Sequence, residues 1–360
     1  MASGSNSSTS EFALLESKGD GTWTAIKATN PGEKDLYIAL RWCNFLVPIP
    51  NDPYENKPEE GPLTRPEVAS WVHVNSLVLK DRDVAYRIFN HKNIVSIAGS
   101  IEVDSSVEAT PASAGLERTD YLVWDHCAHF DLSARIQAMR ESPGEAIEES
   151  FCWHVLTSLL EAITYLHDGK RLVEVGGRRR WKAESSTWTP ILHGKIEPRN
   201  VLFQKKRQGE EHDRCKLADL RWAVALNHKI SYVGEADELD EDGGSAASRM
   251  GRLVATVSLD ACAWKPQNPH EHSIDSELCS LGRLIFTMMT GEGREDEIYK
   301  KYTGYLTGEP KGPYSEQLAV VVKFLLDRRY FLTRFAEMRI ERVLPLTKVV
   351  MEYFREWKSY

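Results

Sequence analysis

The hydrophobic periodicity of the chain changes near residue 130, and this change narrows the fold more than any other feature. Upstream, short apolar runs punctuated by glycine are typical of β-strands, and a helical pattern covers residues 67–89. Downstream, apolar residues recur about every 3.6 positions, which is typical of amphipathic helices. The expected strands lie within 11–47, Ile94–Val103 and Tyr121–Trp124, and the expected helices within Glu148–His167, Ser276–Thr290 and Glu316–Tyr360. We therefore expect an α+β protein with a small β-rich part and a larger, mostly helical part.

Three segments stand outside this pattern. Residues 1–10 are rich in serine and glycine and predict a disordered tail. A basic, glycine-containing insertion covers residues 169–189. A second insertion, residues 235–248, is acidic, and its composition also predicts disorder.

Charge and cysteine content limit the partners and the compartment. The 360 residues carry a net charge of -8, so polyanions would bind only at a local basic patch. The six cysteines form no Cys-x-x-Cys pair, which favours a reducing, intracellular location, cytoplasmic or nuclear. Because no apolar run approaches roughly 20 residues, we expect no membrane partner.

One basic patch lies in the first insertion. It consists of Arg178, Arg179, Arg180 and Lys182 around Trp181. Cations with an interleaved aromatic residue favour phosphate-rich partners such as RNA. The alternative is a solvated loop that balances the acidic segment at Glu235–Asp242.

Several short segments occur in an informative order. They are Leu15–Ile26 with Gly19 and Gly21, Tyr37-Ile-Ala-Leu-Arg41, Asn90-His-Lys-Asn-Ile94-Val95, Tyr121–Cys127 followed by Asp131-Leu132, Ile191-Leu-His193-Gly194-Lys195-Ile-Glu197-Pro-Arg199-Asn200-Val-Leu-Phe203, Lys216-Leu-Ala-Asp219-Leu-Arg221, Trp264-Lys-Pro-Gln267, and Glu277–Gly282. Each segment is a weak signal alone. Together they resemble, in order and spacing, the motifs of the protein-kinase family over most of residues 12–290.

The resemblance implies a bilobal protein-kinase-like fold, with an N-lobe at residues 11–125 and a C-lobe at residues 126–360 that carries both insertions. It also implies ATP and Mg²⁺ as ligands. Asp219 and Asn200 match the metal-binding residues, and two oxygen ligands suit a magnesium ion that arrives with a nucleotide. Alternatively, both residues only hydrogen-bond their own loops. The residues expected at the nucleotide are Gly19, Gly21, Arg41, Asp125, Cys127 and Asp131.

The catalytic loop departs from the family pattern at its most important position. Lys195 stands where the family has its catalytic aspartate, and a charged ammonium has no lone pair with which to accept a proton. Glu197 stands where the family has a lysine, so the two charges are exchanged. Such a pair could retain some chemistry, or it could be a simple salt bridge of the loop. His193 is expected to be a buried structural residue.

Other departures point in the same direction. Arg41 replaces the lysine that contacts the phosphates, and its partner on the following helix could be Asp81 or Asp83, since Arg82 occupies the matching position. The remaining changes are Thr24, Trp124, Gly194, Arg221 and Gln267.

The sequence therefore predicts a pseudokinase, a signalling, regulatory or scaffold module that binds a protein partner. The alternative is an enzyme on a repurposed kinase fold, either an atypical phosphotransferase that uses Glu197 or a transferase for another activated substrate such as aminoacyl-tRNA. A third option is an interaction domain without any small-molecule ligand.

Overall fold

The computed structural model describes about three fifths of the chain, and the described residues are α+β, as expected. They are residues 11–19, 22–27, 36–41, 71–74, 82–103, 119–127, 131–142, 146–226, 230–231, 274–291, 313–334 and 342–359. The predicted tail at residues 1–10, the acidic insertion at 235–248 and the segment Trp264–Gln267 lie outside them. The chain divides into two compact units, one within residues 1–67, 77–90 and 95–128, and the other within residues 68–76, 91–94 and 129–360. The predicted lobe boundary at residue 125 stays a prediction.

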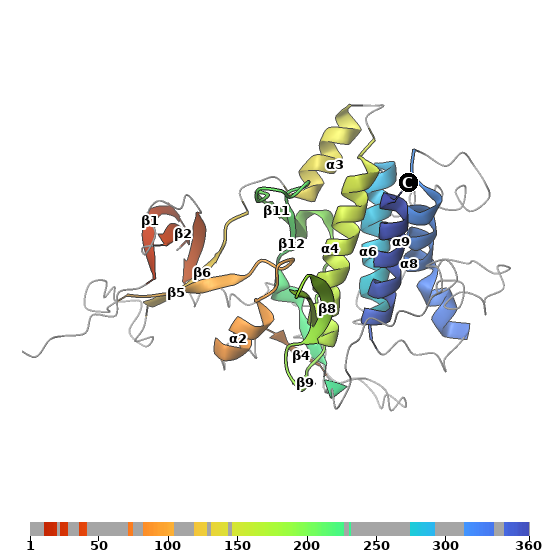
Figure 1. The fold of residues 1–360 in the computed structure, drawn as a ribbon. Coiled ribbons are helices and arrows are strands. Elements are labelled where there is room, and N and C mark those ends of the chain that lie inside the picture. The colour runs from red at the N-terminus through yellow and green to blue at the C-terminus, as the bar shows by residue number, and fades with distance from the viewer. Residues whose placement is uncertain are drawn as a thin grey trace, which may run out of the picture. The chain divides into compact units, whose positions relative to one another are not determined.

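The described residues of the first unit form a five-stranded antiparallel sheet and one short helix (Figure 1). The strands are β1 (Phe12–Gly19), β2 (Thr22–Lys27), β3 (Tyr37–Arg41), β5 (Ile97–Val103) and β6 (Thr119–Asp125), in the order β1-β2-β3-β6-β5. The helix is α2 (Arg82–Ile88). The strands expected from the apolar runs are therefore present in the described part of this unit.

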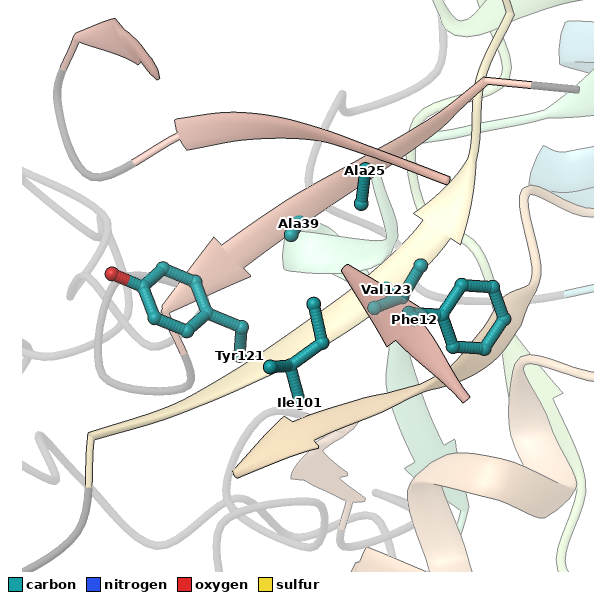
Figure 2. Packing of buried hydrophobic residues seen from close by; sticks show 6 residues of the cluster. All are labelled: Phe12, Ala25, Ala39, Ile101, Tyr121 and Val123. Carbon is teal, nitrogen blue, oxygen red and sulfur yellow. The ribbon is translucent and has the colours of Figure 1, made fainter. Parts of the chain in front are cut away.

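All five strands contribute to the core of this sheet. Figure 2 shows its six buried side chains, Phe12, Ala25, Ala39, Ile101, Tyr121 and Val123. The ring of Phe12 meets Tyr37 edge to face, with 5.1 Å between the ring centroids. Phe12 also requires Gly99, because a Cβ at that position would lie 2.5 Å from its ring. The Phe12 side chain of β1, at one edge of the sheet, thus requires glycine at position 99 of β5, at the other edge.

The prediction of a helix over residues 67–89 is wrong at residues 71–73, whereas residues 67–70 and 75–81 lie outside the described residues. Trp71–His73 form a strand, β4, which pairs with β13 (Val224–Leu226) in the second unit. Within the predicted range, the described helix is α2, Arg82–Ile88. Aromatic and β-branched side chains favour a strand when a pairing partner is present, and here the partner is about 150 residues away in sequence.

Helices form the centre of the second unit. They are α3 (Leu132–Glu141), α4 (Glu149–Asp168), α6 (Ile274–Thr290), α8 (Glu316–Arg334) and α9 (Leu344–Lys358). Helix α4 contacts α6 and α9, and α8 contacts the same two helices (Figure 1). The amphipathic pattern predicted α4 and α6 to within two residues at each end.

Short strands and 3-10 turns complete this unit. They are β7 (Lys170–Val175), β8 (Arg178–Ala183), β9 (Thr187–Trp188), β10 (Ile191–Leu192), the turn η3 (Pro198–Asn200), β11 (Val201–Gln204), β12 (Arg214–Leu217), the turn η4 (Leu220–Trp222), β13 and β14 (Ile230–Ser231). The basic insertion is therefore an ordered hairpin, β7–β8. Its turn, Gly176-Gly177, has positive φ at both residues, as a two-residue hairpin turn of this kind requires.

The segment His91–Ile94 is fixed to α4 and β12. His91 stacks on Tyr165 at 4.8 Å, and Lys92 forms an ion pair with Glu161 at 2.6 Å. Asn93 accepts the backbone N–H of Leu217 with its carbonyl oxygen, at 2.8 Å. Within the predicted motif Asn90–Val95, the residues His91–Ile94 belong to the second unit, and Asn90 and Val95 belong to the first.

The end of α4 caps the start of α9. The fully buried Asp168 accepts the backbone N–H of Val343 at 3.1 Å and that of Leu344 at 2.6 Å. These are N–H groups that a helix N-terminus leaves without an intrahelical acceptor. One turn away, the buried hydroxyls of Thr164 and Thr347 hydrogen-bond at 2.7 Å. Two polar contacts therefore fix the register between two helices far apart in sequence.

Within the described residues, no helix combines the length and the apolar character that a membrane crossing needs. Cys127, Cys152, Cys215 and Cys279 are all thiols outside disulfide bonds.

Asp168→Ala should destabilise the protein by about 3 kcal/mol, because each buried donor left unsatisfied costs roughly 1–3 kcal/mol. Denaturant unfolding followed by circular dichroism measures the change. The control is Glu174→Ala at an exposed position of β7, for which we expect a change within about 0.5 kcal/mol. Equal effects of the two substitutions would contradict the capping role of Asp168.

Candidate functional site

The residues that match the catalytic loop, His193–Asn200, form a loop between β10 and β11, and we call it the central loop. At its start, β10 pairs with β13. At its end, η3 leads into β11, whose ladder with β12 places Asn200 beside Ala218; the N–H of Ala218 donates to the carbonyl oxygen of Asn200 at 2.8 Å. Asp219 follows directly. The fold therefore brings both predicted metal ligands to one end of the β11–β12 ladder.

His193 is fully buried, and both of its ring nitrogens are engaged. Nε2 donates to the carbonyl oxygen of Ala218 at 2.9 Å, and Nδ1 accepts the backbone N–H of Lys195 at 3.2 Å. Burial lowers the pKa of His193 to about 4. The imidazole is thus neutral and serves the loop rather than a substrate.

Glu277 holds the central loop from inside α6. Its carboxylate accepts the backbone N–H groups of His193 and Gly194, at 2.6 Å for Gly194. The side chain is buried, and this burial raises its pKa to about 7, against the effect of the two hydrogen bonds. The sequence prediction missed this role. The available signal was a carboxylate on the same helix face as the buried Leu281 and Leu284.

Lys195 stands where the resemblance predicts a catalytic aspartate, and its ammonium group has two close neighbours, Trp222 and Glu197. Its Nζ lies 4.5 Å from the centre of the Trp222 ring and 3.9 Å from Oε1 of Glu197. A cation over an indole face is stabilised electrostatically. Trp222, from η4, is a second residue that the sequence prediction missed, since nothing local to it indicates a contact with residue 195.

Glu197 is surrounded by donors of its own loop. Its Oε1 accepts Nε of Arg199 and, at 3.4 Å, Nδ2 of Asn200, in addition to the ion pair with Lys195. The exchanged charges of Lys195 and Glu197 therefore do meet, as the salt-bridge hypothesis proposed, and Arg199 joins them.

A cavity of about 370 Å³ borders the central loop on the side of α3 and α6. Ile196, Glu197 and Pro198 line it from the loop. Arg140 of α3 and Arg283 of α6 bring positive charge to its wall. Glu197 thus binds residues of its own loop and also lines a cavity within the second unit.

Asn200 and Asp219 fit a shared ion only in company with other ligands. Nδ2 of Asn200 donates to the carbonyl oxygen of Lys195 at 2.9 Å, so this amide is oriented with its Oδ1 as the remaining ligand atom. Asp219 has φ of 65°, the left-handed conformation that is uncommon for residues other than glycine. No group of three or more His, Cys, Asp or Glu side chains suited to a metal occurs among the described residues. Two oxygen ligands suit Mg²⁺ that keeps waters and phosphates as its other ligands.

The residues predicted to contact a nucleotide are distributed over both units. In the first unit, Gly19 ends β1, Arg41 ends β3 and Asp125 ends β6, where its Oδ2 accepts the N–H of Ser96 at 3.0 Å. Cys127 follows β6 and is half-buried. In the second unit, Asp131 caps α3 by accepting the N–H of Ala134 at 2.9 Å.

Several other residues that were predicted to contact the phosphates lie outside the described part of the chain. They are Gly21, Asp81 and the side chains of Arg41, Arg82 and Arg221. Asp83 is described and is exposed on α2. Trp124 is buried, and its ring meets Phe89 edge to face at 5.0 Å.

Comparisons with known proteins give a distant kinase-like relationship. No protein-family model matches the chain. Among curated proteins, it is similar to the G2-specific protein kinase nim-1 of Neurospora crassa, with 24% identity over 259 residues. The match covers 66% of this chain, and the chain spans about a quarter of the relative, 26% of its length.

Replacing Glu277 by glutamine should remove a pH dependence of stability. The native pKa of about 7 lies above the ordinary 4.5, so between these values the native state holds a proton that the unfolded state has released. This contribution is fully present below pH 4.5 and is lost as the pH rises through 7. Relative to Glu277→Gln, the wild-type unfolding free energy should therefore fall by roughly 3 kcal/mol over this window.

Denaturant unfolding of both proteins at intervals between pH 5 and 8 measures this difference. The difference between the two proteins isolates Glu277 from the buried histidines, which are common to both. A difference independent of pH would contradict the proposed burial of an ionisable carboxyl group beneath the loop.

Proposed function

We propose that the chain is a pseudokinase, a kinase-like module with little or no phosphoryl transfer that works as a signalling, regulatory or scaffold component through a protein partner. The single observation that carries this proposal is the environment of Lys195. A cation packed on Trp222 and paired with Glu197 occupies the position where a kinase needs a proton acceptor.

The chemistry of the loop supports the proposal. A protonated amine can neither orient nor deprotonate an attacking hydroxyl group. Loss of the general base alone slows a reaction by about 10²–10⁴, or roughly 3–5 kcal/mol of barrier. His193 offers no replacement, because both of its nitrogens are bound within the loop.

Nucleotide binding without transfer is compatible with the remaining residues. Asn200 and Asp219 would hold Mg²⁺ bound to the phosphates of ATP, and the ion would neutralise phosphate charge. The contact between Asn200 and the carbonyl oxygen of Lys195 orients the amide for this role. The relative's description as a protein kinase supports ATP as the ligand class.

A second candidate function is an enzyme that uses Glu197 on a repurposed kinase fold, as an atypical phosphotransferase or as a transferase for a substrate such as aminoacyl-tRNA. One observation favours it: Glu197 lines the cavity of about 370 Å³ next to the loop. Against it, Lys195, Arg199 and Asn200 already bind this carboxylate. A base must also reach its proton within hydrogen-bond distance.

The purified protein should transfer phosphate from ATP to a generic protein substrate at least about 100-fold more slowly than ordinary kinases, whose turnover is roughly 1–100 s⁻¹. Glu197→Gln should leave any residual rate unchanged, because the carboxylate serves the loop. Incorporation of radiolabelled γ-phosphate measures both rates. Ordinary turnover that Glu197→Gln abolishes would refute the pseudokinase proposal and establish the second candidate.

ATP with Mg²⁺ should raise the melting temperature of the protein. A ligand at roughly 100 times its dissociation constant stabilises the native state by about 2.7 kcal/mol. Asp219→Asn should lose the part of the shift that depends on Mg²⁺, whereas Glu141→Gln, at an exposed position of α3, should retain it. Thermal-shift assays with and without EDTA measure this. The absence of any shift in the wild type would favour an interaction domain without a nucleotide.

A further inference from the structure

The hairpin β7–β8 has two chemically different faces. Residues directly opposite each other in an antiparallel pair share a face, and the faces alternate along each strand. Trp181, opposite Leu172, is buried on one face. Arg178, Arg180 and Lys182 are exposed on the other face, and we call them the basic face. The three cations repeat along β8 at intervals of about 6.8 Å.

No acidic side chain among the described residues pairs with the basic face. The residues opposite it on β7 are Val175, Val173 and Arg171. Arg171 is itself bound by Glu184 at 2.5 Å and lies over Tyr165. The nearby Glu174 is opposite Arg179 and so belongs to the face of Trp181.

The base of the hairpin is fixed to α4. The N–H of Glu184 donates to the carbonyl oxygen of Gly169 at 2.8 Å, and Nε1 of Trp188 donates to that of Leu166 at 2.9 Å. A Cβ on Gly169 would lie 2.4 Å from the Trp188 ring, so the two are in close contact. The basic face is therefore presented on an ordered support, which reduces the entropy lost when a ligand binds.

The course of the chain brings an acidic segment to this hairpin. Ser231 and Ile230 of β14 pair with Thr187 and Trp188 of β9, which directly follows the hairpin. Glu235 comes four residues after Ser231, a reach of at most about 14 Å. Six of the eight residues from Glu235 to Asp242 are acidic. Eight extended residues span about 27 Å, enough for the roughly 20 Å of β8.

We infer that the basic face binds the acidic segment Glu235–Asp242 of the same chain. The tether from β14 gives this segment an effective concentration near the millimolar range, because binding within one chain is an intramolecular event. The net charge of -8 further disfavours external polyanions. The basic hairpin of the isolated protein is then occupied and kept from phosphate-rich ligands. This inference does not depend on the proposed function.

Carbodiimide cross-linking of the intact monomer tests the contact. Lys182 supplies the one amine of the basic face. Its Nζ should form an amide with a carboxylate of residues 235–242, with loss of water to the carbodiimide, and mass spectrometry of the peptides identifies the bond. Raising NaCl from 0.15 to 1 M shortens the screening length from about 8 to 3 Å and should reduce the yield at least about threefold. The exposed Lys205 serves as the control amine and should give no such product.

A second measurement distinguishes RNA as the occupant. A fluorescent 20-nucleotide single-stranded RNA should bind at least about tenfold more tightly once the six acids are neutralised (Glu235→Gln, Asp237→Asn, Glu238→Gln, Asp240→Asn, Glu241→Gln, Asp242→Asn). Adding Arg178→Glu, Arg180→Glu and Lys182→Glu should remove that gain. The inference is overturned if the cross-link is absent. It is also overturned if the wild type binds the RNA through the basic face as tightly as the neutralised variant does.

Discussion

Glu277 accepts the N–H groups of His193 and Gly194 from inside α6, and the geometry of the central loop follows from this contact. A carboxylate buried at this depth persists because its hydrogen bonds partly offset the loss of hydration. With the backbone of residues 193 and 194 fixed, the imidazole of His193 bridges the loop and Ala218. The same arrangement directs Lys195 toward Trp222. A helix in the second unit therefore determines which side chains the loop can present.

The charges on the central loop balance one another locally. Lys195, Arg199 and the amide of Asn200 all approach one oxygen of Glu197. In a site built for phosphoryl transfer, such charges would face the substrate and its metal. Here they stabilise the loop, which is the physical basis for proposing a binding role over a catalytic one. The comparison with known proteins, at 24% identity, supports a distant kinase-like relationship and no more.

The sequence predicted helices and strands whose pattern lies within a short segment. It did not predict contacts between residues that are far apart in the chain. Helix α4 carries a long apolar stripe, and its range was predicted closely. Trp71–His73 were assigned to a helix because their partner strand, Val224–Leu226, is distant in sequence. The contact between Trp222 and Lys195 could not be predicted for the same reason. The resemblance drew attention to Lys195 and Glu197, but nothing in the sequence predicted that Arg199 also binds Glu197.

The hairpin β7–β8 differs greatly in packing between its two ends. At its base, Gly169 lies against Trp188, and an added methyl group would collide with the indole. At its tip, a Cβ on Gly176 or Gly177 would meet nothing within 4 Å. The tip is therefore a suitable position for an inserted, labelled epitope, because inserted residues there meet no packed side chain, whereas replacing either glycine would strain the turn. A label at that point would report on whatever approaches the hairpin while leaving the helical core intact.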